Sequence, residues 1–211
     1  MNCHICNKKT EPFFHEKTNI TYYHCKSCEF ISKSSEYYQD LEGQKLRYNL
    51  HQNNEDSTGY RAYFQRFLDF TLNLIPNVGR ALDFGCGRTS LLAKMFEENG
   101  IPCDYYDPIY HPNIFSKNYD LVVSIEVFEH LHNPKKTFER LISMLPKGGY
   151  LAIQTEFHLN NLEAFKTWYY HQDPTHIVFF TKKSFQVLAS MHASVVVMDN
   201  GKNMVLIQKK Y

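Results

Sequence analysis

Four cysteines near the N-terminus have the spacing of a metal site. They form two pairs, each with two residues inside the pair and with 18 residues between the pairs: Cys3, Cys6, Cys25 and Cys28. Two such pairs can place four thiolates at the corners of a tetrahedron, the geometry that Zn²⁺ adopts in structural sites. We therefore expect a zinc-ribbon module. The alternative is four reduced, buried thiols without a metal.

A glycine turn is the second motif that could carry chemistry. In LDFGCGRTS, Gly85 and Gly87 separate a predicted strand from a predicted helix, and Asp107 follows 20 residues after Gly87. Glycine lets the backbone approach a ligand, and a carboxylate at the end of the next strand can accept hydrogen bonds from both ribose hydroxyls. Alternatively, Asp83 and Asp107 only cap the turns. The predicted ligand-binding residues here are Asp83, Gly85, Cys86, Gly87, Asp107 and Pro108.

Three polar residues follow the apolar run at 121–125. Glu126, Glu129 and His130 are three and four positions apart, so a helical segment would place them on one face. Two carboxylates and an imidazole suit a divalent cation or acid–base catalysis.

Alternating strands and helices must position these residues. Apolar runs predict strands at 81–84, 101–107, 121–125 and 150–155, and a closing hairpin formed by 195–198 and 204–208. Helical patterns cover 59–75, 90–98, 134–145 and 184–191. This order predicts an α/β fold with a doubly wound, Rossmann-like, mostly parallel sheet and a terminal antiparallel hairpin.

Length and composition are compatible with a small module and one α/β domain. We divide the 211 residues into a zinc ribbon (1–33), a linker with a helical segment (34–79) and the main domain (80–211). The net charge of +1 gives no support to a nucleic-acid partner. The polar N-terminus and the lack of an 18-residue apolar run predict a cytoplasmic protein without a membrane partner.

From about residue 60 onward, the chain resembles the class I S-adenosylmethionine-dependent methyltransferases. LDFGCG resembles the first motif of that family, YDLVVSIEVFEHLHNP the fourth, and LPKGGYLAIQT the loop and strand that follow. The resemblance implies that Gly85 and Gly87 face the methionine part of S-adenosyl-L-methionine. It also implies that Asp107 binds the ribose and that Glu126 lies beside the cofactor.

One segment departs from the family pattern. Only 12 residues separate Asp107 from Asp120, where the family has a helix, a further strand and a loop. We expect one edge strand to be missing, together with the loop that contacts adenine. The candidates to replace that contact are His111, Asn113, Ile114 and Phe115.

The same region is also similar to metal-dependent O-methyltransferases of the ubiquinone-biosynthesis and small-RNA 3′-terminal ribose types. They share a Glu-x2-Glu-His motif and a later histidine. The resemblance implies that Mg²⁺ or a similar ion lowers the pKa of an acceptor hydroxyl. Alternatively, Glu126 orients the cofactor, and Glu129 and His130 close a helix start. The implied ligands of the second metal are Glu126, Glu129, His130 and His176.

A polar, aromatic loop at 168–176 is the predicted wall or lid of the acceptor site, unless it is a core-packed aromatic loop. His176 is the predicted general base if no metal is present. The candidate catalytic residues are His176, Glu129, His130 and Asp173.

A ribbon, a polar linker and a methyltransferase core in this order are also similar to bacterial enzymes that act on small molecules, nucleotide-linked sugars or surface-glycan precursors, and to ribosomal-RNA base methyltransferases whose zinc module helps hold RNA. The near-neutral charge, the few clustered Lys and Arg and the aromatic-rich C-terminal loop favour the first kind, so we expect O-methylation of a small-molecule or sugar- or glycan-type acceptor. An RNA methyltransferase that holds RNA with the zinc module becomes favoured if the lysines of residues 8–33 form one stripe. A catalytically inactive, zinc-dependent binding module is the non-enzymatic alternative. A nicotinamide dehydrogenase is disfavoured, because Ser90 stands where the last glycine of GxGxxG is needed.

Overall fold

A six-stranded sheet forms the centre of the computed structural model, which describes residues 1–49, 58–112 and 118–211. The strands are β4 (Ala81–Phe84), β5 (Cys103–Tyr106), β6 (Leu121–Ile125), β7 (Tyr150–Gln154), β9 (Ser194–Asp199) and β10 (Met204–Lys209). In the order β5-β4-β6-β7-β10-β9, the first four strands are parallel, and β10 is antiparallel to both neighbours. The predicted fold class is confirmed, and in the described part of the chain β5 and β9 are the two edge strands.

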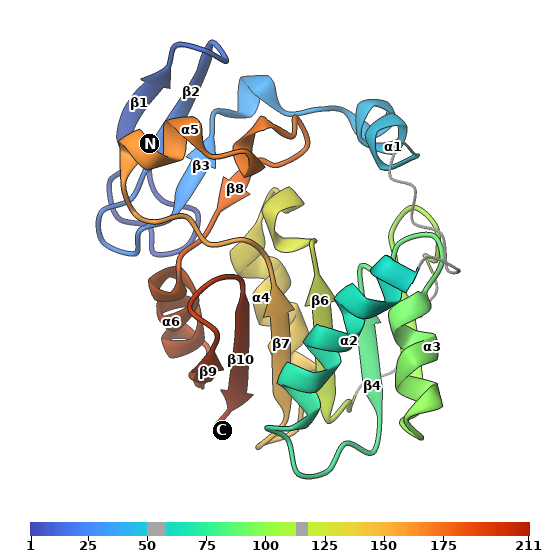
Figure 1. Ribbon diagram of the computed structural model, residues 1–211. Helices are drawn as coiled ribbons and strands as arrows, with labels where there is room; N and C mark the ends of the chain where they lie inside the picture. The colour runs from blue at the N-terminus through green and yellow to red at the C-terminus, as the bar shows by residue number, and fades with distance from the viewer. Residues whose placement is uncertain (50–57, 113–117) are drawn as a thin grey trace.

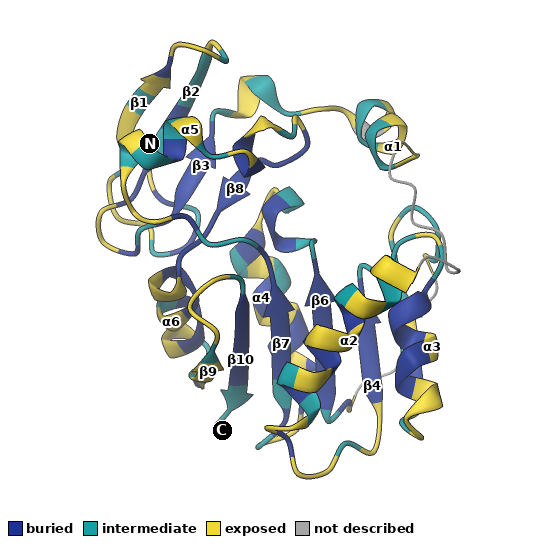
Figure 2. Cartoon of the chain, in the orientation of Figure 1, coloured by how far each residue is buried: buried dark blue, intermediate teal, exposed yellow. Residues whose placement is uncertain are grey.

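Helices cover both faces of this sheet (Figure 1). They are α2 (Thr58–Leu72) and α3 (Leu91–Glu98) on one face, and α4 (Pro134–Ser143) and α6 (Lys182–Met191) on the other. Within β6, Val122 packs into one core, while Leu121 and Val123 pack into the other. The central strands are therefore buried on both sides, as Figure 2 shows. No helix in the described ranges has the length and apolar character that crossing a bilayer requires.

The N-terminal residues form a second, antiparallel sheet. Its first three strands are β1 (Glu11–His15), β2 (Ile20–His24) and β3 (Ile31–Lys33). The fourth, β8 (Val178–Phe179), comes from the C-terminal part of the chain and pairs with β3. The sequence does not predict this pairing, which joins the N-terminal module to the predicted acceptor loop. The predicted domain boundaries stay predictions.

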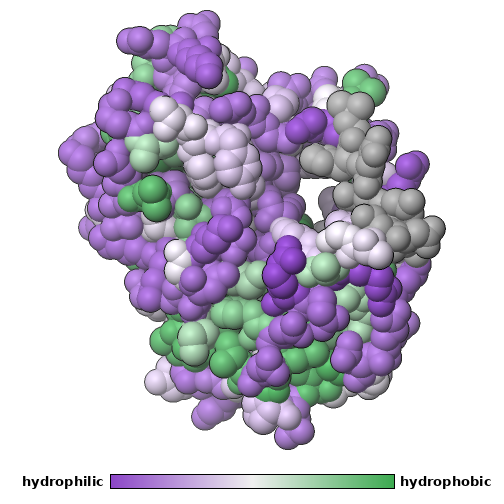
Figure 3. Space-filling model, viewed as in Figure 1, coloured by the Kyte–Doolittle hydropathy of each residue, from purple (hydrophilic) through white to green (hydrophobic). Residues whose placement is uncertain are grey.

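Short elements complete the chain around a hollow. They are α1 (Leu41–Asn49), α5 (Leu162–Thr167) and three single-turn 3-10 helices, η1 (Ser35–Tyr37), η2 (Phe128–His130) and η3 (Tyr170–Gln172). In Figure 3 the hollow lies between the surface over the N-terminal sheet and the surface over α2. The segment after β6 forms the 3-10 turn η2, and not the α-helical turn that the spacing of its polar residues suggests.

Candidate active site

A cavity of about 1220 Å³ opens at the carboxyl ends of the parallel strands. One wall consists of the turn after β4 and the loop after β5. A second wall is formed by the residues after β6, and a third by the loop 169–176 together with α1. The predicted cofactor and acceptor residues therefore surround one common space, where open α/β sheets usually bind ligands.

The glycine turn after β4 is held against the end of β5. The N–H groups of Gly85 and Cys86 donate to the carbonyl oxygen of Tyr106 over 2.7 and 3.1 Å. Gly85 and Gly87 have positive φ angles of 86° and 64°. A Cβ on Gly85 would lie 2.2 Å from Cγ2 of Val127, whereas no described atom lies within 4 Å of a Cβ on Gly87. The backbone at Gly87 therefore leaves room for a ligand.

Asp107 connects its own loop to this turn. Its Oδ2 accepts from the N–H of Gly87 over 3.2 Å, and its Oδ1 accepts from the N–H groups of Ile109 and Tyr110 over 2.8 and 3.0 Å. These are the capping bonds that the alternative explanation expects. A carboxylate has about four lone-pair positions, so the three bonds leave capacity for a ligand. Asp107 and Pro108 both line the cavity.

Asp83 and Cys86 lie beneath the turn. Asp83 is 2% exposed, and its Oδ2 has no hydrogen-bond partner among the described residues. Burial, and then the charge of Asp107, raises the pKa of Asp83 to about 7. Burial also raises the pKa of the Cys86 thiol, whose Sγ donates to the carbonyl of Gly87. Cys86 thus fills space as a small apolar residue.

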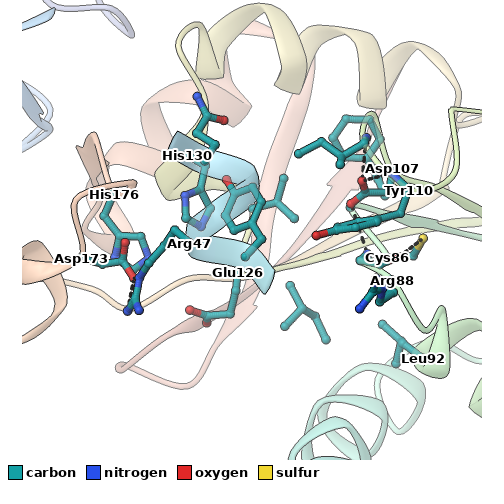
Figure 4. Close-up of a pocket in the computed structure, with 18 of the residues that line it drawn as sticks. Arg47, Cys86, Arg88, Leu92, Asp107, Tyr110, Glu126, His130, Asp173 and His176 are labelled. Carbon is teal, nitrogen blue, oxygen red and sulfur yellow. Dashed lines mark hydrogen bonds and ion pairs between the residues drawn. The ribbon is translucent and has the colours of Figure 1, made fainter. Parts of the chain in front are cut away.

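Glu126 leaves β6 with a φ of 52° and holds its carboxylate between two tyrosines. Tyr63 donates to its Oε1 over 3.1 Å and Tyr170 to its Oε2 over 2.9 Å. Burial, and then the charge of Glu129, raises the pKa of Glu126 to about 8. Figure 4 shows Glu126 between the group around His176 and the group around Asp107. It therefore stands at the boundary of the two halves of the cavity.

Glu129, His130 and His176 form a compact cluster. Their possible ligand atoms all lie within 4.8 Å of one another. Glu129 is fully buried, and its Oε2 accepts from Oγ1 of Thr155 over 2.8 Å. Its Oε1 lies 3.7 Å from Nε2 of His130 and has no hydrogen-bond partner within residues 1–49, 58–112 and 118–211. The structure thus groups three of the four predicted ligands and leaves Glu126 outside.

Backbone carbonyls fix both imidazole rings of the cluster. Nδ1 of His130 lies 2.9 Å from the carbonyl oxygen of Thr175, and Nδ1 of His176 lies 2.7 Å from that of Tyr170. A carbonyl oxygen only accepts, so each Nδ1 carries the proton and each Nε2 keeps its lone pair. The same arrangement orients histidines that bind metals.

The titration of the cluster distinguishes its members. Burial, and then the neighbouring His130, lowers the pKa of His176 to about 3. Burial raises the pKa of Glu129 to about 7. His176 is therefore neutral at physiological pH and a weak base, whereas the carboxylate of Glu129 is the stronger proton acceptor.

Asp173 lies on the acceptor loop but is already occupied. Nε and Nη2 of Arg47 approach its Oδ2 to 2.9 and 2.8 Å, as Figure 4 illustrates. The backbone N–H and the hydroxyl of Thr175 donate to its Oδ1 over 2.9 and 2.6 Å. Burial raises the pKa of Asp173, but the bonds from Arg47 and Thr175 outweigh burial and lower it well below its usual range. Asp173 thus anchors α1 to the loop and is unsuited to proton transfer.

The four N-terminal cysteines converge as their spacing predicts. Sγ of Cys3 lies 3.5 Å from Sγ of Cys28, and Sγ of Cys6 lies 3.5 Å from Sγ of Cys25. All four sulfur atoms lie within 4.8 Å of one another. Thiolates bound to one tetrahedral Zn²⁺ at about 2.3 Å would be about 3.8 Å apart, so the arrangement suits that ion.

Two site residues were missed from the sequence, and one predicted contact is altered. The helical spacing predicts a buried position for Tyr63, yet its hydroxyl reaches Glu126; a polar tip on an otherwise apolar face was the available signal. Arg47 had no signal, because its helix lacks a clear apolar face. His111 donates from Nε2 to the carbonyl of Arg88 over 3.1 Å. The other adenine candidates, Asn113, Ile114 and Phe115, lie outside the described residues.

A family model described as a methyltransferase domain matches residues 56–191. Among curated proteins, no match to the chain reaches significance.

Several solved structures have a similar fold. The N-methyltransferase NodS from Bradyrhizobium japonicum, in complex with S-adenosyl-L-homocysteine, is 13% identical with a TM-score of 0.54, and the match covers 82% of this chain and all of that one. A chain of the Haloferax volcanii complex between the Trm112 methyltransferase activator and a methyltransferase is 12% identical with a TM-score of 0.55, over 72% and 93% of the two chains. The O-methyltransferase segment of StiE is 14% identical with a TM-score of 0.50, over 82% and 78%.

Proposed function

Because the chain belongs to the methyltransferase-domain family, we propose that it transfers a methyl group from S-adenosyl-L-methionine to an oxygen atom of a small, polar acceptor. One observation carries the proposal. The glycine turn with Asp107 and the cluster of Glu129, His130 and His176 line or border a single cavity, with Glu126 between them. A methyl donor held at one end and a hydroxyl held at the other would meet beside Glu126.

The cofactor half of the cavity fits S-adenosyl-L-methionine. Gly87 leaves open space beside the backbone, and Asp107 keeps acceptor capacity for ribose hydroxyls. The orphaned Oδ2 of Asp83 can accept from a ligand's amino group or N–H. When bound, the cofactor supplies an electrophilic methyl group with a good leaving group. The protein's task is then mainly to position the two reactants.

The acceptor half fits a divalent cation. Glu129 offers an unpartnered buried oxygen among the described residues, and His130 and His176 offer Nε2 lone pairs in a fixed tautomer. A site with one carboxylate and two imidazoles is less selective for Mg²⁺ and Mn²⁺ than an all-oxygen site. Other divalent ions can therefore bind there as well. A bound cation would lower the pKa of an acceptor hydroxyl. If no cation binds, the candidate base is His176, which lines the cavity and keeps a lone pair on Nε2, whereas Glu129 is fully buried and does not line the cavity; burial makes the His176 ring a weak base.

The zinc module belongs to the same proposal as a structural part. Cys3, Cys6, Cys25 and Cys28 would fill all four positions around Zn²⁺ and leave none open for catalysis. One of its five lysines, Lys33, is buried and cannot contact RNA, and the exposed Lys26 pairs with Glu11 over 2.7 Å. A small-molecule acceptor therefore stays the favoured partner.

The test is methyl transfer from labelled S-adenosyl-L-methionine to separated small-molecule and RNA fractions of a cell extract. We expect the label in the small-molecule fraction, in a methyl ether that resists alkaline hydrolysis. Added Mg²⁺ or Mn²⁺ should increase the rate of labelling. Binding of S-adenosyl-L-homocysteine is measured in parallel by calorimetry. Label in RNA would favour the alternative enzyme, and a chain that binds no S-adenosyl-L-homocysteine would be the inactive module.

A further inference from the structure

Lys33 is a buried lysine at the end of the short strand β3. Only 1% of its surface is exposed. Its Nζ donates to the carbonyl oxygen of Pro174 over 3.2 Å, and its backbone N–H donates to the carbonyl oxygen of Ile177 over 2.8 Å. A buried ammonium group is costly unless it is well placed for its partners, so this position needs a reason. The reason lies in the loop that it touches.

The two contacts of Lys33 bracket His176. The side chain holds the loop on one side of the histidine, at Pro174, and the backbone holds it on the other side, at Ile177. The N–H of Ile177 donates in turn to the carbonyl of Glu129 over 2.8 Å. Lys33 thereby holds the segment around His176 with both its side chain and its backbone, and it is connected to Glu129 through the backbone of Ile177.

The second cysteine pair fixes the position of Lys33. Directly before β3, the N–H of Cys25 donates to the carbonyl of Phe30 over 2.8 Å, and the carbonyl of Cys28 accepts from Oγ of Ser184 over 2.9 Å. After these anchors, Ile31 pairs with Phe179 and continues the ladder toward the loop. The path from the cysteines to the loop is therefore short and consists mostly of backbone hydrogen bonds.

We propose that Lys33 is a positioning residue, through which the four-cysteine module holds His176 and its loop in place at the acceptor side of the cavity. The consequence for catalysis rests on the proposed function, but the structural coupling does not. The module then supports one wall of the cavity from behind, through the loop 169–176, and its role differs from that of an appended binding domain.

The only tryptophan of the chain is a natural probe of this coupling. The ring of Trp168 lies 5.0 Å from that of Tyr170, whose carbonyl fixes His176, and 6.0 Å from that of Phe179 in β8. A displaced loop would change the surroundings of Trp168. Its emission and its quenching by acrylamide therefore report on the loop without an acceptor or an assay.

The first experiment compares Lys33→Met with the matched control Lys26→Met, which alters an exposed lysine of the same module. For Lys33→Met we expect a red-shifted emission and about two-fold stronger acrylamide quenching, with the affinity for S-adenosyl-L-homocysteine within about two-fold of wild type. Lys26→Met should match wild type in both readouts. An unchanged Trp168 signal in Lys33→Met would overturn the proposal, and so would an equal change in Lys26→Met.

A second measurement needs no variant, in case Lys33→Met does not fold. Amide hydrogen exchange is followed in the full chain loaded with zinc and after chelation of the zinc. We expect exchange at residues 173–179 to become at least about ten-fold faster, while residues 81–84 and 103–106 change less than about two-fold. Equal acceleration in both regions, or none at 173–179, contradicts the coupling. Failure of the proposed function would appear separately, as wild-type protein that binds no S-adenosyl-L-homocysteine.

Discussion

At the scale of single residues, the site is organised by groups that are already satisfied on one side and open on the other. In both His130 and His176, Nδ1 donates its proton to a backbone carbonyl, and the lone pair of Nε2 stays available on the cavity side. Asp107 accepts two hydrogen bonds from its own loop and one from the glycine turn, and keeps capacity for a ligand. Side chains held in this way lose little further freedom when a ligand arrives, which favours both affinity and orientation.

Replacing Asp107 with alanine should weaken cofactor binding. The variant loses the carboxylate that would accept from the ribose and also the bond that holds the N–H of Gly87. Hydrogen bonds to a charged group are worth about 1.5–3 kcal/mol, so we expect about 10- to 100-fold weaker binding of S-adenosyl-L-homocysteine by calorimetry. Asp69→Ala, on the exposed face of α2, is the control and should bind as wild type does. Equal affinities in all three proteins would return Asp107 to a capping role.

Replacing His176 with alanine should leave cofactor binding intact and lower turnover. The ring lies in the Glu129–His130 cluster, away from the glycine turn, so the affinity for S-adenosyl-L-homocysteine should stay within about two-fold of wild type. Turnover should fall at least about 100-fold, because the proposed cation site loses one of its three ligands and, without a cation, the cavity loses its candidate base. Binding of Mn²⁺, followed by electron paramagnetic resonance, should also be lost. A variant that loses cofactor binding to the same extent as Asp107→Ala would contradict these separate roles.

At the scale of elements, the turn between β4 and α3 is the most constrained connection in the site. Gly85 combines a left-handed backbone with a Cβ direction that points at Val127. Gly148, in the turn before β7, has a nearly identical φ of 85° but no described atom within 4 Å of its Cβ direction. A comparison of alanine substitutions at the two glycines therefore distinguishes the cost of a left-handed backbone from the cost of a steric clash.

Gly85→Ala should destabilise the protein more than Gly148→Ala. Both substitutions place an alanine in the left-handed region at a cost of about 1 kcal/mol, and only Gly85→Ala adds a clash at 2.2 Å with Val127. We expect Gly148→Ala to lower the free energy of unfolding by about 1 kcal/mol and Gly85→Ala by about 3 kcal/mol, measured with urea. Equal losses would mean that Val127 yields without cost.

The elements that sequence reasoning predicted are those with local signals. A few neighbouring residues are enough to predict each of these elements. Examples are the apolar runs of β4, β6 and β7 and the turn at Asn200-Gly201. Strand β8 could not be predicted, because two residues that pair with a strand far away in the sequence leave no local pattern. Likewise, the expected four-residue ligand set assumed helical geometry, whereas Glu126 has a positive φ, accepts from Tyr63 and Tyr170, and lies outside the three-residue cluster.

At the scale of the whole molecule, the N-terminal sheet and the main domain share buried polar contacts. One of them is His158, which donates from Nε2 to the carbonyl of Glu29 over 2.8 Å and accepts at Nδ1 from the N–H of Asn160 over 3.1 Å. Burial lowers the pKa of His158 to about 4. Protonation would place a charge in a buried joint and remove an acceptor.

The contribution of His158 to the stability of the fold should therefore become unfavourable in mild acid, opposite in sign to that of the buried carboxyls whose pKa values are raised. The unfolded chain binds a proton at His158 below a pH of about 6.5, while the folded chain resists until a pH of about 4, so stability is lost as the pH falls through this window. At pH 5, His158 should lower the free energy of unfolding by about 2 kcal/mol, because one pKa unit corresponds to about 1.36 kcal/mol. Urea unfolding of wild type and His158→Gln at pH 7.5 and pH 5 measures it. The change in unfolding free energy from pH 7.5 to pH 5 should be more favourable in the variant than in wild type by about 2 kcal/mol, and equal changes would exclude a contribution of His158.

The pairing of β3 with β8 also has a consequence for the order in which a nascent chain can fold. Lys33 leaves the ribosome long before Val178 is polymerised, and at typical elongation rates the wait is on the order of ten seconds. During that interval the three N-terminal strands can pair with one another, but their sheet ends in an unpaired edge. Translation speed between these two strands, and chaperones that shield such an edge, should therefore influence the yield of the native enzyme more than the same changes would after residue 180.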